Sequence, residues 1–276
     1  MNAELLADCL IPEWHAPPGV RALCTTRSGG TSAPPYDSLN LGLHVGDDSA
    51  AVAANRQRLA ATLASMGAGR PVFLNQVHGQ RCLHLQATTP ASPDTPGTPD
   101  GYEADACTTT TPGAVCTIMV ADCLPVLLAA ADGSRVAAAH AGWRGLAGAG
   151  GVGVLEEVLK AFRPQEPANT APAAPEIVAW LGPCIGPAAF EVGPEVRAAF
   201  VESLPPAAGC FVPSGAGKWL ADLAGLARQR LAAAGVSRIS GNDGSAAWCT
   251  VGNPSRFFSH RRDRVSGRMA ACIWLE

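Results

Sequence analysis

Three side chains in this sequence are suited to holding a metal or activating a substrate: the imidazoles of His78 and His140 and the thiol of Cys123. His140 opens the string His-Ala-Gly-Trp-Arg-Gly, in which Gly142 and Gly145 let the backbone pass close to a bound group. Two imidazoles and a thiolate bind zinc and leave its fourth tetrahedral position open, as in catalytic zinc sites. A single histidine near a strand end more often has a structural role, so the prediction requires the three to converge.

The dipeptide Asp132-Gly133 lies between two strand-like runs and is the strongest hairpin signal in the chain. If these two residues form the turn, Pro125 lies opposite His140 and Cys123 lies opposite Gly142. Cys123 and His140 are then diagonal neighbours on one face of the hairpin, with backbones roughly 7–8 Å apart. Two side chains can close that separation onto one metal ion. An error of one residue in the turn would place them on opposite faces.

Cys123 admits a second interpretation, in which its thiolate is a nucleophile served by His140 or His78, as in Cys-His hydrolases. In a third interpretation, the same residues bind a structural metal ion that stabilises a partner-binding surface. Structural zinc normally has four protein ligands, and only three are found in the motifs, so this interpretation is disfavoured.

The donor set could also hold a blue copper ion, with the thioether of Met119 nearby. A multicopper oxidase needs many more imidazoles, arranged in His-x-His pairs. This chain has six histidines and no such pair. The multicopper interpretation is therefore rejected. The open three-ligand arrangement predicts zinc as the cofactor.

The elements that must position these residues can be read from the hydrophobic pattern. Short apolar runs bounded by turn residues predict strands, and apolar residues at three- and four-residue spacing predict helices. The predicted strands are residues 114–120, 124–130, 135–139, 176–181, 257–261 and 269–275, and the predicted helices are residues 154–162 and 220–231. Because the strands flanking the hairpin are antiparallel, we expect a layered α+β fold instead of a strictly alternating α/β one.

The length of 276 residues suits one domain covering residues 1–276. Two Pro-rich segments, near residues 87–99 and 164–175, interrupt it as loop insertions because proline at that density blocks both helix and sheet.

Composition excludes several classes of function. The formal net charge is -3, with 20 Lys+Arg against 23 Asp+Glu, so there is no basic excess for nucleic acid. The N-terminal sequence lacks a signal-peptide pattern, and no apolar run is long enough to span a bilayer. We expect a cytoplasmic protein without a membrane partner, in which most of the ten cysteines are reduced.

Residues 75–79 (Asn-Gln-Val-His-Gly), 121–125 (Ala-Asp-Cys-Leu-Pro) and 140–145 resemble the three signature motifs of the YfiH-like laccase-domain family of purine nucleoside phosphorylases, formerly called polyphenol oxidoreductase laccases. The resemblance runs from about Arg21 to the C-terminus, and the Pro-rich insertions depart from the compact family pattern. Further matching segments are residues 25–30, 36–42, 181–186 and 258–263, together with Gly267-Arg268.

The resemblance implies a mixed, largely antiparallel β-sandwich flanked by helices and related to cysteine hydrolases. It implies zinc on His78, Cys123 and His140. It also implies phosphorolysis of adenosine, inosine, guanosine and methylthioadenosine, with an adenosine deaminase activity. Some relatives are linked to the editing of peptidoglycan precursors. If Cys123 is a nucleophile, the resemblance therefore implies a Cys-dependent amidase or hydrolase that acts on such precursors.

Either chemistry needs further groups beside Cys123 and His140. Asp105 and Asp122 are candidates for moving protons, with Glu103 a weaker third. Arg27 and Arg144 could hold phosphate through their guanidinium forks, and Asn40 and Gln76, in the matching motifs, are further substrate-binding candidates. The expected partners are therefore purine nucleosides and phosphate, for a monomer or homodimer. We expect structural or incidental roles for a last group of residues: His44, His84, Cys116 and Cys272.

Overall fold

The computed structural model describes residues 2–87, 89, 101–163 and 175–276. The two Pro-rich segments predicted as loop insertions lie almost entirely outside these residues.

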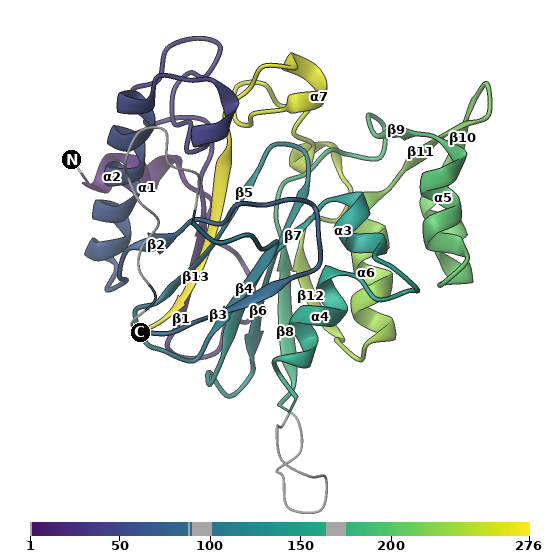
Figure 1. The fold of residues 1–276 in the computed structure, drawn as a ribbon, viewed down its shortest axis with the longest axis horizontal. Helices are drawn as coiled ribbons and strands as arrows, with labels where there is room; N and C mark the ends of the chain where they lie inside the picture. Colours follow the sequence, from purple (N-terminus) through teal and green to yellow (C-terminus); the bar gives the residue numbers. More distant parts are fainter. Residues whose placement is uncertain (1, 88, 90–100, 164–174) are drawn as a thin grey trace, which may run out of the picture.

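The described chain folds into three sheets with helices on both sides (Figure 1). The four-stranded sheet has the order β1 (Val20–Cys24), β13 (Met269–Leu275), β5 (Val115–Val120) and β2 (Pro71–Val72). The six-stranded sheet has the order β12 (Arg238–Gly241), β8 (Ile177–Leu181), β6 (Leu124–Ala130), β7 (Val136–Ala141), β4 (Ala106–Thr109) and β3 (Cys82–Leu85). A small sheet contains β10 (Phe211–Gly215), β11 (Lys218–Ala221) and β9 (Glu191–Val192).

The α-helices are α1 (Asn2–Asp8), α2 (Ser49–Ser65), α3 (Trp143–Ala147), α4 (Val154–Lys160), α5 (Pro194–Val201), α6 (Leu223–Ala233) and α7 (His260–Asp263). Short 3-10 turns are found at η1 (Leu43–Val45), η2 (Pro205–Cys210) and η3 (Ala246–Trp248).

Successive side chains of a strand point to opposite faces of its sheet, and the buried side chains therefore form three hydrophobic layers. In β13, Ala271 and Ile273 face the six-stranded sheet, whereas Cys272 and Trp274 face α1 and α2. The outer face of the six-stranded sheet packs against α3, α4, α5 and α6. The result is the mixed α+β sandwich that the sequence predicts, with antiparallel pairs predominating and parallel pairs at β2–β5, β3–β4 and β8–β12.

The register predicted for the central hairpin is confirmed. Pro125 pairs with His140 in the antiparallel ladder between β6 and β7. The turn is wider than the two residues predicted, because β6 ends at Ala130 and β7 begins at Val136. Within it, the Asp132 carboxylate accepts hydrogen bonds from both the backbone N–H and the hydroxyl of Ser134. In the ladder between β6 and β7, the turn widens by the same number of residues on each strand, so Cys123 and His140 still lie on the same face of the hairpin.

Two predicted elements need correction. No strand covers residues 257–261. Phe257 and Phe258 are buried and so resemble strand residues, but the Phe257 N–H donates to Asn253 within a turn and α7 begins at His260. The predicted helix at 220–231 begins later, at Leu223, because Leu220 belongs to β11.

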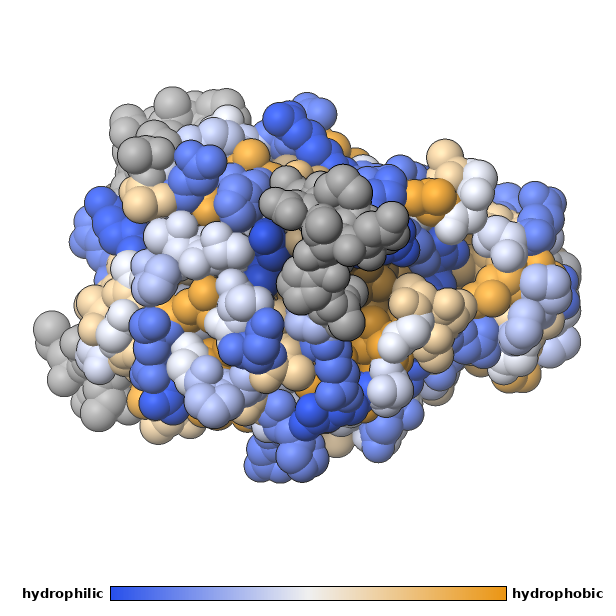
Figure 2. Space-filling model, turned by 90° about the horizontal axis from the view of Figure 1, so that it is seen from below, coloured by the Kyte–Doolittle hydropathy of each residue, from blue (hydrophilic) through white to orange (hydrophobic). Residues whose placement is uncertain are grey.

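The surface in Figure 2 carries hydrophilic side chains spread among smaller hydrophobic areas. Large exposed apolar side chains of the described residues, namely Ile11, Val77, Val212 and Val265, come from four separate segments. Scattered apolar residues of this kind need no partner surface to explain them. Within the described part of the chain, no helix has the length and apolar character needed to cross a bilayer.

Candidate active site

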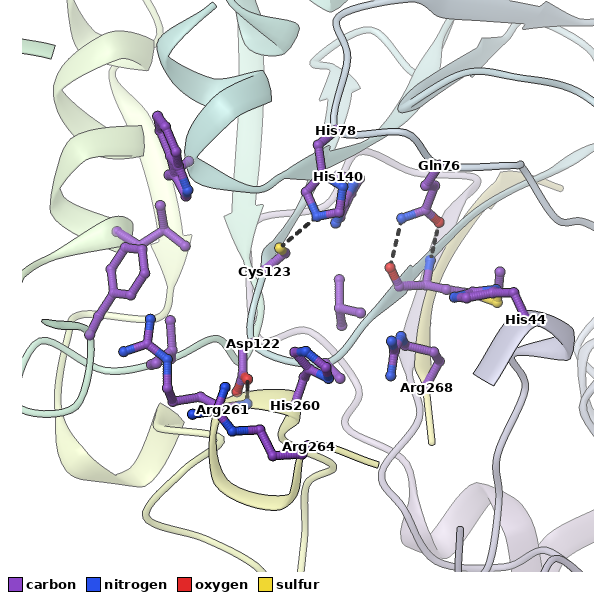
Figure 3. Close-up of a pocket in the computed structure, with 17 residues that line it drawn as sticks. His44, Gln76, His78, Asp122, Cys123, His140, His260, Arg261, Arg264 and Arg268 are labelled. Atoms are coloured by element: carbon purple, nitrogen blue, oxygen red, sulfur yellow. Dashed lines mark hydrogen bonds between the residues drawn. The ribbon is translucent and has the colours of Figure 1, made fainter. Parts of the chain in front are cut away.

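The three predicted ligands converge at one end of the interface between the two large sheets (Figure 3). His78 comes from the loop between β2 and β3, Cys123 from the turn between β5 and β6, and His140 from β7. The Sγ atom of Cys123 lies 3.7 Å from Nε2 of His78. The ring centroids of His78 and His140 are 4.8 Å apart, and the three ligand atoms all lie within 4.8 Å of one another.

These distances fit a single metal ion. Tetrahedral zinc with ordinary Zn–S and Zn–N bond lengths separates its sulfur and nitrogen ligands by about 3.6 Å. The separation of 3.7 Å between Cys123 and His78 meets that requirement. His78 is exposed, Cys123 half-buried and His140 buried, so the ligand group is open on one side. The residues present therefore fit a three-ligand metal site with an accessible fourth position.

The buried carboxylate of Asp105 forms hydrogen bonds with two of the predicted ligands, His78 and His140. Its Oδ1 lies 2.8 Å from Nδ1 of His140 and accepts the N–H of His78 at 2.8 Å. Its Oδ2 accepts the N–H groups of Val77 and Gly79 at 3.2 and 2.6 Å. Because Nδ1 of His140 is engaged, Nε2 is left for a metal, which is the usual way a carboxylate orients a ligating histidine.

Glycines permit the close approach of these segments. A Cβ atom on Gly142 would lie 2.9 Å from both Sγ of Cys123 and Cδ2 of His78. One on Gly145 would lie 2.7 Å from the carbonyl oxygen of Gly79. The backbone is also strained here, since His78 and Asp122 have φ values of 62° and 87°, which side chains other than glycine rarely adopt.

The thiol of Cys123 and the imidazole of His140 each shift the pKa of the other. Burial would raise the pKa of Cys123, but the charge and hydrogen bonds of His140 and His78 outweigh burial and lower the pKa to about 6. Burial would lower the pKa of His140, but Cys123 and Asp105 outweigh it and raise that pKa to about 9. Thiolate character at neutral pH suits both a metal ligand and a nucleophile.

The ligands open into a cavity of about 360 Å³. One part of its lining is apolar or aromatic, with Trp143, Ile185, Phe190 and Leu223. Another part is basic: His44, His260, Arg261, Arg264 and Arg268. The cavity can thus receive a ligand that combines a flat apolar ring with an anionic group.

Two other predicted site residues line this cavity. The Asp122 carboxylate accepts the hydroxyl of Thr250 and the N–H of Arg261, each at 2.6 Å. Gln76 also faces the cavity, but its amide is engaged with the N–H and carbonyl of Met119 at 2.7 and 2.8 Å.

The remaining predicted residues lie elsewhere. Arg27 lines a separate hollow and donates to the carbonyls of Asp37 and Pro254. Asn40 is buried and bridges backbone groups of Gly42 and Arg268. Neither Arg144, which stacks on Trp143, nor Glu103 belongs to the cavity lining.

Sequence reasoning assigned no role to the basic residues of the cavity. His44 was expected to be incidental, yet it lines the cavity. His260, Arg261 and Arg268 lie in the C-terminal matching motifs, and Arg264 lies between those motifs. The concentration of basic residues between positions 260 and 268, in a chain with net charge -3, is the signal that could have singled them out.

The mixed α+β sandwich carries an open group of two histidines and one cysteine that could bind a metal ion beside a cavity. The chain belongs to the multi-copper polyphenol oxidoreductase laccase family, whose model matches residues 21–276.

Its relatives carry a different description. A protein of Escherichia coli named purine nucleoside phosphorylase YfiH is 48% identical over 270 residues, covering 98% of this chain and 100% of the relative. A purine nucleoside phosphorylase of Pseudomonas aeruginosa is 46% identical, covering 97% of this chain and 98% of the relative.

Solved structures share the fold. A Neisseria meningitidis protein matches with a TM-score of 0.80 at 43% identity, over 98% of this chain and 99% of its own. YlmD from Geobacillus stearothermophilus matches with a TM-score of 0.81 at 34% identity, over 94% of this chain and 93% of its own.

Proposed function

We propose that this chain is a zinc-dependent purine nucleoside phosphorylase that acts on adenosine, inosine, guanosine and methylthioadenosine and also deaminates adenosine. The observation that carries the proposal is the convergence of His78, Cys123 and His140 at a cavity with an aromatic and a basic side. The names of the relatives support the choice of reaction.

One thiolate and two imidazoles with an open fourth position suit catalytic zinc, and a bound zinc ion would supply a Lewis acid at that position. Cys123 and the Nε2 atoms of the two histidines would hold it. Asp105 keeps His140 in the tautomer that a metal requires.

In phosphorolysis, a phosphate oxygen bonds to C1′ of the ribose while the bond from C1′ to N9 of the purine breaks. The purine leaves with the bonding electron pair and must gain a proton. Among the two aspartates predicted to move protons, Asp122 is the better candidate because its carboxylate lines the cavity. Asp122 accepts two hydrogen bonds but faces the cavity, whereas Asp105 is fully enclosed and accepts four, so we assign Asp105 a positioning role.

Trp143, Phe190 and Leu223 give the cavity a wall against which a purine ring can pack. In deamination, water adds to C6 of the same ring and ammonia leaves, with Asp122 again placed to move the protons. Both reactions would use this wall to bind the base and Asp122 to move protons.

The proposal is tested by incubating the zinc-loaded protein with adenosine, with and without phosphate, and measuring adenine and inosine. We expect adenine and ribose 1-phosphate to form only with phosphate, and inosine to form in either case. Adenine release that does not need phosphate would contradict phosphorolysis.

One observation favours a second function, a Cys-dependent amidase or hydrolase acting on peptidoglycan precursors. Cys123, His140 and Asp105 stand in the order of a nucleophile, a base and an orienting carboxylate, and the pKa of Cys123 is lowered to about 6. His78 argues against it, because a nucleophile needs one base whereas a metal site uses both imidazoles. An acyl group trapped on Cys123, or labelling of Cys123 by iodoacetamide in zinc-replete protein, would favour the hydrolase.

A further inference from the structure

The cavity carries a concentrated basic surface that the metal site does not use. Arg261, Arg264 and Arg268 come from one short segment at and after α7. In Figure 3 they lie across the cavity from Cys123 and His78, with His260 beside Arg261 and Arg264 and with His44 close to Arg268.

These arginines interact with acidic groups of the described chain only at longer range, Arg268 with Asp122 and Cys123 and Arg261 with Glu191. None of the three guanidinium groups forms a salt bridge within the described parts of the chain. Their neighbour Arg262 differs, because it pairs with Asp263 at 2.7 Å. Asp122 is the carboxylate in the cavity lining, and its oxygens accept the Thr250 hydroxyl and the Arg261 backbone N–H, not an arginine side chain.

The fold holds two of these arginines in place by neutral contacts. Nη1 of Arg268 donates to the carbonyls of Ser266 and Gly267 at 2.8 and 3.1 Å, while its backbone N–H donates to Asn40. Nη1 of Arg261 donates to the carbonyl of Glu191 at 3.1 Å. Arg264 has a φ of 63°, an uncommon conformation for a side chain other than glycine, at the end of α7. Such contacts fix the positions of cations while leaving donors for an anion.

We propose that Arg264 and Arg268, assisted by Arg261, form the subsite that holds the attacking phosphate, an assignment that rests on the proposed phosphorolysis. Phosphate presents several anionic oxygens to the planar donor forks of arginine, and a cavity wall with unpaired guanidinium groups attracts it. The site would then receive phosphate on its basic side, the purine on its aromatic side and the ribose between them.

The assignment replaces Arg27 and Arg144 as the phosphate ligands. Arg27 donates to Asp37 and Pro254 in a separate hollow. Arg144 is exposed on α3 and stacks on Trp143, outside the cavity lining. Neither guanidinium reaches the space that the metal ligands share.

Two sources could supply the phosphate group: inorganic phosphate, or the 5′-phosphate of a nucleotide. The test measures the KM for inorganic phosphate with adenosine as substrate in Arg264→Gln and Arg268→Gln, and measures AMP as a competitor. Arg256→Gln is the matched control, since Arg256 is exposed in the preceding loop and lies outside the metal cavity. Calorimetric titration of phosphate into the zinc-loaded protein without nucleoside provides a readout independent of turnover.

We expect each cavity variant to raise the KM for phosphate by about tenfold or more, because each removes a charge-assisted hydrogen bond. The KM for adenosine should change little. Arg264→Lys should recover part of the loss, and Arg256→Gln should match wild type. Arg264 is exposed, so its variants remain informative if Arg268→Gln does not fold.

Unchanged phosphate KM in both variants, or a loss confined to Arg144→Gln, would overturn the subsite while leaving phosphorolysis intact. AMP that competes strongly in wild type but weakly in the variants, with no change in phosphate KM, would overturn it in favour of nucleotide binding. If wild type binds phosphate in the calorimeter and the variants do not, while no adenine forms, the arginines bind phosphate but the proposed phosphorolysis fails.

Discussion

Asp105 does not face the cavity, but its carboxylate orients His140 and binds the backbone of the loop that carries His78. Its pKa is lowered: burial opposes ionisation, but the hydrogen bonds from His140 and from the backbone N–H groups outweigh burial. An ionised carboxylate can accept all of these hydrogen bonds, whereas an amide must present a donor to some of them.

Asp105→Asn is therefore expected to weaken zinc binding about 10–100-fold, as measured by competition with a chelator. Asp132→Asn, at an exposed carboxylate of the β6–β7 turn, should leave zinc affinity unchanged. Equal zinc affinity in Asp105→Asn and wild type would show that Asp105 does not position the ligands.

The coupled pair of Cys123 and His140 predicts a pH dependence in zinc-free protein. Because the pKa of Cys123 is lowered to about 6, its thiolate predominates above that pH and disappears below it. The rate of alkylation by iodoacetamide should rise through pH 6 and then level off, and zinc should protect the residue.

His140 lowers the pKa of Cys123 more than any other group does, and His140→Gln removes that effect. The pH at which alkylation reaches half of its maximal rate should therefore rise toward the ordinary thiol pKa near 8.5. A wild-type midpoint already in that range would contradict the coupling between the thiol and the imidazole.

At the scale of elements, the site depends on how closely α3 and the end of β7 approach the His78 loop. Gly142→Ala should displace Cys123 and His78, because the new methyl group would lie 2.9 Å from each. We expect zinc content and turnover to fall together while the far-UV circular dichroism stays native.

Gly209→Ala is the matched control, since a Cβ atom there would meet nothing within 4 Å. Full zinc content in Gly142→Ala would mean that the ligands can move apart without losing the metal.

The elements that the sequence predicts well are those with strong periodicity. The ladder of β6 and β7 follows from an Asp-Gly turn between two apolar runs, and this local signal was enough to place Cys123 and His140 on one face. The convergence of His78 with them could not be derived this way, because it depends on Asp105 binding the backbone of a distant loop. The sequence predicted that convergence only through the resemblance of the three motifs to those of a known family.

The basic side of the cavity escaped prediction for a related reason. Residues 257–268 carry two buried aromatic residues, which favoured a strand, whereas the segment is a turn and a short helix anchored by Arg262. Irregular segments have no periodicity from which the direction of a side chain can be read. The positions of Arg264 and Arg268 therefore emerge only from the folded chain.

At the scale of the whole molecule, the site lies where two sheets meet, and the layers beneath it should affect stability without affecting chemistry. Cys116 is fully buried between the sheets, and burial raises the pKa of its thiol well above the ordinary value. Such a thiol behaves as a small apolar side chain.

Cys116→Ala should lower the free energy of unfolding by about 1 kcal/mol, measured by urea denaturation, with turnover per folded molecule nearly unchanged. Loss of turnover in a fully folded Cys116→Ala protein would mean that the catalytic site had been misplaced.

The central claim is that His78, Cys123 and His140 together hold one zinc ion, and the most direct test is elemental analysis of the purified protein beside Cys123→Ala. We expect near one zinc per chain in the wild type and a large loss in the variant, since removing the thiolate leaves only two ligands. Wild-type protein without zinc, undiminished zinc in Cys123→Ala, or a blue absorption band that indicates copper would contradict the account.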